Sequence, residues 1–298
     1  MTIRIGNAPV SWAIYEFKDI EPKYHFSRVL DEIASTGYVG TELGPWGFLP
    51  PDAAALRPEL DKRGLQMVSA YVPVKLVDPS AHPAAEAEAI KVGKLLAALG
   101  AKYIVLADDN GTVPELINEA GRAQGSRLSA AQWDVVASAV NRIARKVNEE
   151  TGLKFAFHHH CAGYVETPEE IRNLMDRTDA NLVGLCLDTG HYQYGGGDAL
   201  EAVQTYGSRI WHLHFKDCDM NVRSQCAAQK LNYFEAVGAG VFCELGKGSV
   251  DFPAIIAGME KLGFDGWATV EQDILVEDLD APRESAARNR DYLRGLGL

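Results

Sequence analysis

The chain has 298 residues, 47% of them hydrophobic and 23% charged, and a formal net charge of −12. This size and composition are typical of a globular protein with one large α/β domain or two ordinary ones. No basic stripe offsets the acidic charge, which argues against nucleic acid as a partner, and no apolar run approaches the roughly 18 to 20 residues that span a membrane. Five cysteines without paired spacing and an N-terminus without a signal-peptide pattern predict a cytoplasmic location.

Strand-like and helix-like segments alternate with a period of about 30 residues. The predicted strands are residues 3–10, 40–43, 65–72, 103–107, 154–158, 183–188, 210–214 and 267–271. The predicted helices lie near residues 26–36, 52–63, 84–99, 130–150, 199–206, 252–262 and 281–293. One more helix is predicted to begin after Thr167, which suits the N-cap position of a capping box closed by Glu170.

Strands and helices that alternate in this way predict a (β/α)8 TIM barrel, an α/β fold, as one domain over residues 1–298. A doubly wound sheet is the structural alternative, but no glycine fingerprint follows the first strand. The longest connection, residues 217–250, cannot be a simple loop. It is predicted to form a lid-like excursion over the mouth of the barrel.

Metal-binding side chains follow the last four predicted strands directly, and six of the eight histidines fall between residues 158 and 214. The C-terminal ends of the strands are where the chemistry of such barrels takes place. These positions favour Asp188, His214 and Glu271 as ligands of one divalent metal, with Glu166 or His158 as the fourth. A mixed set of nitrogen and oxygen ligands suits Mn²⁺, Co²⁺ or Mg²⁺ better than a structural zinc ion.

Two of these positions also have a simpler interpretation. Asp188 precedes a strand–helix turn, where an aspartate can serve as a helix cap. Glu166 stands beside the Thr167 cap, where the helix dipole favours a negative charge. Both interpretations stay open for the sequence alone.

Other polar residues at the same ends of the strands are candidates for catalysis. His158 and His160 share one face of their strand, so that one could bind the metal while the other transfers protons. His191 follows a glycine and could turn back over the site as an acid–base group, the alternative being a plain loop histidine. Lys216 could hold a substrate oxygen with Asp217 behind it, or the two could form an ion pair.

Substrate contacts are expected in the same mouth of the barrel. Glu42 ends the second predicted strand and suits a hydroxyl-binding or catalytic carboxylate. Trp12 and Trp46 could line the pocket, as aromatic faces do against the C–H groups of sugar rings, or could belong to the core.

Motifs at the ends of the later strands resemble the xylose-isomerase-like superfamily of barrels. They are Asp188-Thr-Gly-His191, His212-Leu-His-Phe-Lys-Asp217 and Val270-Glu271. Within this superfamily the residues 6–12, 36–44, 158–160 and 165–167 look most like those of inosose dehydratases, which dehydrate 2-keto-myo-inositol. The resemblance covers nearly the whole chain and implies metal ligands at Asp188, His214 and Glu271. The sequence departs from epimerase relatives at His158, roughly where these carry a glutamate.

The resemblance implies a hydro-lyase that dehydrates an inosose, a 2-keto-myo-inositol-like cyclic polyol, through an enediolate. The dehydration would depend on a divalent metal, Mn²⁺ ahead of Co²⁺ or Mg²⁺. Histidine in place of the carboxylate favours elimination, because expelling a hydroxyl needs an acid and histidine can supply one at neutral pH. A ketose isomerase or epimerase is the first alternative, and a non-catalytic polyol-binding barrel is the second. The expected partner is a small polyol or sugar, and a homo-oligomer stays open.

Overall fold

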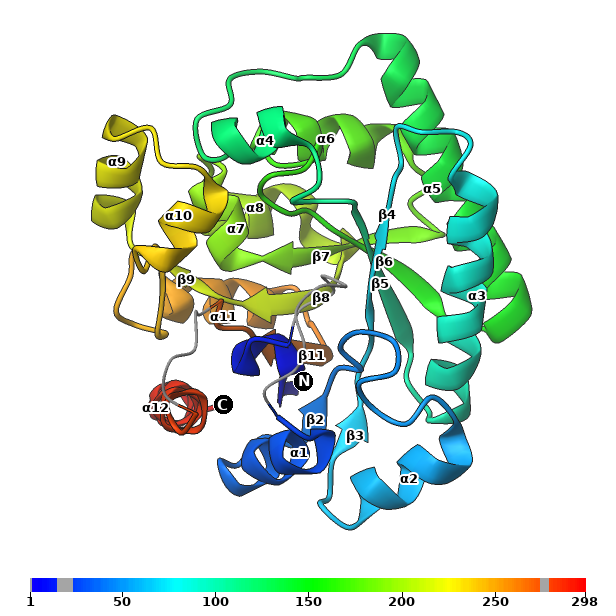
Figure 1. The fold of residues 1–298 in the computed structure, drawn as a ribbon, viewed down its shortest axis with the longest axis vertical. Coiled ribbons are helices and arrows are strands. Elements are labelled where there is room, and N and C mark those ends of the chain that lie inside the picture. The colour runs from blue at the N-terminus through cyan, green and yellow to red at the C-terminus, as the bar shows by residue number, and fades with distance from the viewer. Residues whose placement is uncertain (1, 15–23, 274–278) are drawn as a thin grey trace.

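The computed structural model describes residues 2–14, 24–273 and 279–298. Within these residues, parallel strands form one curled sheet in the order β3-β2-β1-β11-β8-β7-β6-β5-β4, with helices around it (Figure 1). The strands are β1 (Ile3–Asn7), β2 (Gly40–Thr41), β3 (Gln66–Met67), β4 (Tyr71–Val74), β5 (Tyr103–Asp108), β6 (Lys154–His158), β7 (Val183–Asp188), β8 (Ile210–Phe215) and β11 (Gly266–Val270).

The third predicted strand is split into β3 and β4, and this split closes the sheet into a barrel. The strand β3 pairs with β2, whereas β4 pairs with β5 at the other end of the strand order. Between them the backbone N–H of Val68 donates to Thr41 at 2.9 Å, and the N–H of Val105 donates to Ala70 at 3.0 Å. A barrel with eight strand positions, as predicted, is therefore confirmed.

The helices of the barrel pack against the outer face of the sheet (Figure 1). They are α1 (Phe26–Ser35), α2 (Ala53–Asp61), α3 (His82–Ala98), α5 (Ala130–Thr151), α6 (Pro168–Arg177), α8 (Ala199–Tyr206), α11 (Phe252–Lys261) and α12 (Ala281–Gly295). Short 3-10 turns lie at Pro9–Trp12 and Gly207–Arg209. The capping box of Thr167 and Glu170 is present at the start of α6, as predicted.

Alternation along β6 decides which side chains enter the barrel. Phe155 and Phe157 belong to the large apolar core that includes the inner faces of the helices. Ala156 packs instead with Val105 and Cys186 in a small separate cluster. Because side chains two residues apart share a face of a strand, His158 lies on the same side as Ala156, inside the barrel.

Residues 217–250 fold into an additional unit beside the mouth of the barrel (Figure 1). This unit contains β9 (Asp217–Cys218), α9 (Met220–Ala228), α10 (Tyr233–Gly238) and β10 (Phe242–Cys243). It shares a second apolar cluster with the short helices α4 (Pro114–Glu119) and α7 (Thr189–Tyr194).

The carboxylate of Asp217 holds the two ends of this unit together. It accepts backbone N–H groups from Cys218, Gly246, Gly248 and Val250 at 2.8 to 3.0 Å. The possible ion pair of Asp217 with Lys216 is therefore not formed, because both carboxylate oxygens serve the backbone. In the part of the chain that the structure describes, no helix combines the length and the apolar character needed to cross a membrane.

Candidate active site

Four buried side chains converge at the C-terminal ends of β6, β7, β8 and β11. They are His158, Asp188, His214 and Glu271, and each offers one ligand atom within 4.8 Å of the others. His158 Nε2 lies 3.5 Å from Asp188 Oδ2, and His214 Nδ1 lies 3.2 Å from Glu271 Oε1. The Asp188 Oδ2 to His214 Nδ1 distance is 4.0 Å. Strand ends that are far apart in the sequence thus present one cluster of nitrogen and oxygen atoms.

Several of these atoms lack a hydrogen-bond partner. The Oδ1 atom of Asp188 accepts the His191 backbone N–H at 2.7 Å and caps α7, so the simpler interpretation of Asp188 holds for this oxygen. Among the described residues, Asp188 Oδ2, His158 Nε2 and His214 Nδ1 make no hydrogen bond, although all three atoms are buried, and their shortest ion-pair contacts are 3.2 to 3.5 Å. Buried polar atoms are costly when unpaired, and lone pairs that face one another suit a bound cation. The donor set fits a divalent metal.

Glu42 fixes the orientation of His214. Its Oε1 atom lies 3.0 Å from His214 Nε2 and 2.9 Å from His212 Nε2, and it also accepts the Thr269 hydroxyl at 2.9 Å. Burial alone would raise the pKa of Glu42, but His214 and His212 hold it well below its ordinary value. Since an ionised carboxylate only accepts, Nε2 of His214 carries a hydrogen. Although burial opposes charge, Cys186, Glu271 and Glu42 raise the pKa of His214 well above its ordinary value, so Nδ1 also carries a proton toward Glu271. A bound cation would replace that proton, and Nδ1 would then offer its lone pair to the cluster.

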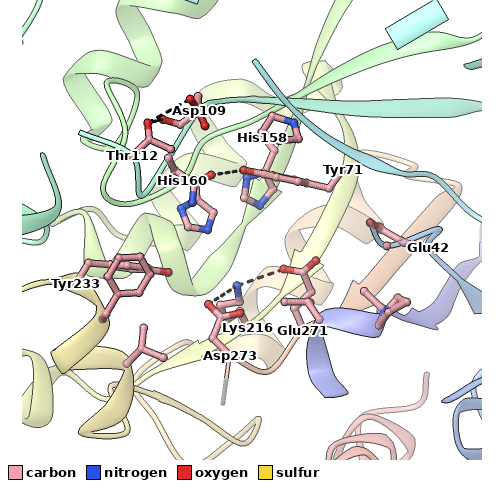
Figure 2. A pocket seen from close by; sticks show the side chains of 18 of the residues that line it. Glu42, Tyr71, Asp109, Thr112, His158, His160, Lys216, Tyr233, Glu271 and Asp273 are labelled. Atoms are coloured by element: carbon pink, nitrogen blue, oxygen red, sulfur yellow. Dashed lines mark hydrogen bonds and ion pairs between the residues drawn. The ribbon is translucent and has the colours of Figure 1, made fainter. Parts of the chain in front are cut away.

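Lys216 places a positive charge among three carboxylates. Its Nζ atom lies 3.4 Å from Asp188 Oδ2, 3.2 Å from Glu271 Oε2 and 3.0 Å from Asp273 Oδ2 (Figure 2). Although burial opposes charge, Asp188 and Asp273 raise the pKa of Lys216 well above its ordinary value. Burial also disfavours the charged form of Glu271, but His214 and Lys216 lower its pKa to about 2. The Lys216 ammonium and the Glu271 carboxylate are therefore charged together.

His160 and His191 stand beside the cluster as neutral rings. His160 Nδ1 lies 2.6 Å from the Cys161 carbonyl oxygen, which only accepts, so its Nε2 lone pair stays open. His191 Nε2 lies 2.9 Å from Lys216 Nζ, and the two histidine rings are 3.9 Å apart. Burial and the neighbouring His158 lower the pKa of His160 to about 3, and burial with His160 lowers that of His191. Both rings are therefore neutral in this structure, and their role as acid–base groups stays a prediction.

A cavity of about 630 Å³ opens next to the cluster (Figure 2). Its polar lining includes Glu42, Tyr71, Lys75, Asp109, Asn110, Thr112, His158, His160, Lys216, Tyr233, Glu271 and Asp273. The residues 233, 234 and 237 of the additional unit contribute to one side of it. A volume of this size is typical of sites for small organic ligands.

Several lining residues did not enter the set of candidates from the sequence. Asp109 and Asn110 directly follow β5, so the rule that selected Asp188 and Glu271 would also have selected them. Tyr71 lies within β4, and Tyr233 comes from the additional unit. No pattern in the sequence connects these two tyrosines with the cavity.

The sequence offered Glu166 or His158 as the fourth member of the cluster, and the structure places Glu166 outside it. Glu166 Oε1 accepts the backbone N–H of Gly121 at 2.7 Å, and Oε2 accepts that of Ala162 at 2.9 Å. Arg127 Nη1 lies 3.8 Å from Oε2. Both oxygens are thus used by the backbone, and the expectation that Glu166 is a metal ligand is wrong for this structure.

Neither tryptophan lines the cavity. Trp12 is fully buried, and its indole N–H donates to Glu32 at 2.6 Å, so it belongs to the core between the 3-10 turn Pro9–Trp12 and α1. Trp46 is 39% exposed and lies against the ammonium of Lys91 on α3, with 4.0 Å from Nζ to the ring centroid. The tyrosines 71 and 233 provide the aromatic surface that was expected from these two residues.

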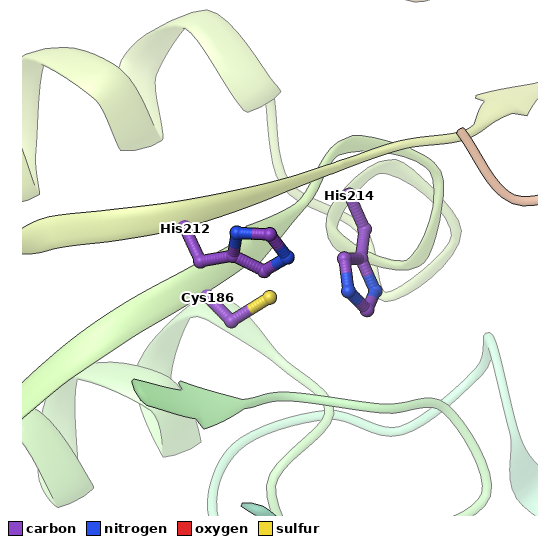
Figure 3. A group of neighbouring side chains, drawn as sticks. All are labelled: Cys186, His212 and His214. Carbon is purple, nitrogen blue, oxygen red and sulfur yellow. The ribbon is translucent and has the colours of Figure 1, made fainter. Parts of the chain in front are cut away.

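A second group of buried potential ligands shares His214 with the first. Figure 3 shows it as Cys186 within β7 and His212 and His214 within β8. The Nε2 atoms of both histidines already donate to Glu42. Burial also raises the pKa of the Cys186 thiol to about 12, so the sulfur is protonated at neutral pH. This group therefore helps to orient His214 for the first cluster and is not a second metal site.

Comparison with known proteins agrees with this architecture. A profile of the xylose isomerase-like TIM barrel family matches residues 30–296. An inosose dehydratase of Clostridium botulinum is 30% identical over 294 residues, which covers 98% of this chain and 96% of that protein. An inosose dehydratase of Geobacillus kaustophilus is 33% identical over 273 residues, 91% of this chain and 87% of that protein.

Solved structures support the fold alone, because their sequence identity is low. A probable 3-DHS dehydratase from Bacillus anthracis superposes with a TM-score of 0.67 at 15% identity, over 98% of this chain and 99% of that chain. An L-ribulose 3-epimerase superposes with a TM-score of 0.70 at 17% identity, over 100% of this chain and 95% of that chain. Taken with the profile match and the full-length relatives, the closed barrel shows that this chain belongs to the xylose isomerase-like TIM barrel family.

Proposed function

We propose that this chain is a hydro-lyase that dehydrates an inosose-type cyclic keto-polyol. Relatives named inosose dehydratases match it over nearly their full length. The cavity supplies hydrogen-bonding groups and aromatic faces of the kind that bind a polyhydroxylated ring. The following paragraphs derive the parts that this chain's own residues would play.

The proposed metal ligands are His158, Asp188, His214 and Glu271. Mn²⁺ is the first choice, with Co²⁺ or Mg²⁺ next, because the set mixes imidazole and carboxylate and contains no thiolate. A divalent metal bound there would polarise the substrate ketone and so make the neighbouring C–H group more acidic. Glu42 would keep His214 in the required tautomer through the 3.0 Å contact with Nε2.

The observation that carries dehydration is geometric: the open Nε2 atom of His160 and the buried Nζ atom of Lys216 line one cavity. His160 Nε2 takes the α-proton, and the C–H electron pair becomes a C=C bond as the C–O bond of the β-hydroxyl breaks. Lys216 Nζ gives a proton to the departing oxygen, which leaves as water. A lysine whose pKa is raised gives its proton only to a strong base, and a departing hydroxide is such a base. His191 and Asp273 hold the ammonium in place.

Epimerisation or isomerisation of a ketose is the second candidate. It needs a proton returned on the opposite face of the substrate carbon, a task that suits two carboxylates on either side of the metal. Glu271 lines the cavity and could be one of them, but His158 stands where the other would be. This single difference favours elimination.

The test uses purified protein loaded with Mn²⁺ and supplied with 2-keto-myo-inositol or a panel of ketohexoses in D₂O. Dehydration predicts new enone absorbance with the inosose and a product ring with one hydroxyl-bearing carbon fewer, measured by NMR. Exchange of the ketohexose α-proton for deuterium without any enone from the inosose would replace dehydration by epimerisation. Protein treated with a chelator is the matched control, and it should regain activity when Mn²⁺ is restored.

A non-catalytic polyol-binding barrel makes a different prediction in the same experiment. Such a protein would bind the inosose without either reaction, whether or not Mn²⁺ is present. Metal analysis after dialysis separates the two classes further, because the proposed enzyme retains about one divalent ion per chain.

A further inference from the structure

The ends of β4 and β5 form a second polar surface in the cavity, opposite the proposed catalytic residues. Asp109 and Thr112 lie on the side of the cavity away from Lys216 and Asp273, with His160 and Tyr71 between them (Figure 2). Asn110 belongs to the same surface. None of these residues takes part in the chemistry proposed above.

This surface is fastened to the loop that carries His160. Asp108 Oδ2 accepts the backbone N–H of Tyr164 at 2.8 Å, and the N–H of Gly111 donates to Ala162 at 3.0 Å. The N–H of Asp109 donates to Val74 on β4 at 2.8 Å. Because the segment 108–111 is bonded to β4 on one side and to the loop of His160 on the other, its backbone keeps a fixed position relative to His160.

Tyr71 sets the distance between this surface and the cluster. Its ring meets the ring of His158 edge to face, with 5.6 Å between centroids, and its hydroxyl is hydrogen-bonded to Asn110 Oδ1. One aromatic ring therefore spans the gap, and a six-membered carbocycle is about as wide as an aromatic ring. A cyclic polyol lying along Tyr71 with its ketone beside His158 would place its opposite carbons beside Asn110.

The two side chains offer complementary hydrogen-bonding groups. Asp109 Oδ2 accepts from Thr112 at 3.2 Å and lies 3.8 Å from Lys75 Nζ, which leaves Oδ1 to accept from a ligand. The Tyr71 hydroxyl occupies the amide oxygen of Asn110, which leaves its NH₂ group to donate. A pair of neighbouring hydroxyls can satisfy both, because one donates to Asp109 while the other accepts from Asn110.

We propose that Asp109 and Asn110 are specificity-determining residues that bind two vicinal hydroxyls on the side of the substrate ring opposite the ketone. The proposal rests on the proposed function for the position of the ketone. It names the substrate class more narrowly, as a six-membered keto-polyol that is hydroxylated on its far side. A site whose polar groups are placed to hydrogen-bond a hydroxyl binds an analogue without that hydroxyl more weakly, since the polar groups of the site are then left unpaired.

The test compares 2-keto-myo-inositol with an analogue that lacks the two hydroxyls opposite the ketone, by KM in the wild type and by calorimetry in the slow His160→Ala background. The Mn²⁺-loaded protein should favour the full ring at least about 10-fold over the deoxy ring in both measurements. Asp109→Asn and Asn110→Ala should each weaken binding of the full ring and reduce the discrimination to about 2-fold, with kcat changed far less than KM. Asp134→Asn, which changes an 80% exposed carboxylate in α5, is the matched control and should leave the discrimination intact.

Calorimetry separates failure of this proposal from failure of the proposed function. Discrimination without any dehydration would overturn the reaction and support these specificity residues. Dehydration with equal affinity for both rings would support the reaction and overturn these specificity residues. Variants that discriminate like the wild type would also overturn the specificity residues. Binding of neither ring would overturn both proposals.

Discussion

Two buried clusters of charged residues lie close together in this barrel, and they differ in how their oxygens are satisfied. In one, Glu166 and Glu170 receive backbone N–H groups and the Arg127 guanidinium, so all of their oxygens have partners. In the other, Asp188 Oδ2 and His158 Nε2 make no hydrogen bond among the described residues and have only the longer ion-pair contacts with each other and with Lys216. Burial alone therefore does not distinguish a structural carboxylate from a candidate ligand. Several atoms without a hydrogen bond that face one another do distinguish them, because buried polar atoms are normally hydrogen-bonded and a bound cation would satisfy such a group together.

The largest expected effect comes from removing an oxygen of the unsatisfied cluster. Glu271→Gln should abolish metal-dependent activity and lower metal retention after dialysis, while the fold stays intact by circular dichroism. The amide replaces a negative ligand by a neutral one and leaves Lys216 with one carboxylate fewer. Asp188→Asn should lower metal retention in the same way. It tests the ligand oxygen more directly, since asparagine still caps α7. A variant that keeps one tightly bound divalent ion would contradict the ligand assignment.

The next effect concerns the neutral ring beside the cluster. His160→Ala should lower turnover by about 10² to 10⁴ because it removes a proton acceptor from the cavity. Metal content should not change, since His160 is not a member of the cluster. Steady-state kinetics with parallel metal analysis measure both quantities. Turnover close to that of the wild type would leave His160 a structural residue.

Arg127→Met breaks the satisfied cluster and should act on stability instead. Glu166 and Glu170 would keep buried negative charges without their counter-ion, at a cost of about 3 to 5 kcal/mol in the free energy of unfolding. Urea denaturation measures this loss, and metal stoichiometry in the folded protein should stay the same. Arg288→Met removes a 52% exposed partner of Glu244 and should cost less than about 1 kcal/mol. Equal losses in the two variants would contradict the contrast between the clusters.

The smallest expected effect lies at Glu42, which is satisfied like Glu166 but contacts a proposed ligand. Glu42→Gln should weaken metal affinity by about 10- to 100-fold, because the amide no longer enforces the tautomer of His214. Competition with a metal indicator dye measures the affinity. Thr269→Val removes only a hydroxyl donor to Glu42 and should have a smaller effect. Unchanged affinity in Glu42→Gln would show that His214 keeps its orientation without this carboxylate.

The sequence predicted the barrel well because each of its signals is local. Apolar strands, glycine-terminated helices and the Thr167 capping box are patterns within a few residues, and the structure contains them. The strand at residues 65–72 was predicted as one and is two, since its first part pairs with β2 and its second with β5. A hydrophobic pattern does not show which neighbour a strand pairs with.

Errors at the candidate site arose where a side chain's partner lies far away in the sequence. Glu166 looked like a ligand because it stands near β6, but Gly121 occupies one of its oxygens from 45 positions upstream. Trp12 lies in the core, where its indole N–H donates to Glu32, 20 positions downstream. Tyr71 was missed because only the closed barrel brings β4 next to the rings of His158 and His160.

The sequence by itself determined the barrel and three members of the cluster, Asp188, His214 and Glu271. Each follows an apolar strand directly, and the C-terminal ends of parallel strands necessarily meet at one mouth. Only the tertiary structure decided that His158 rather than Glu166 completes the cluster and that Lys216 lies among its carboxylates. The physical reason is that hydrogen-bond saturation depends on every neighbour of an atom, and those neighbours come from distant parts of the chain.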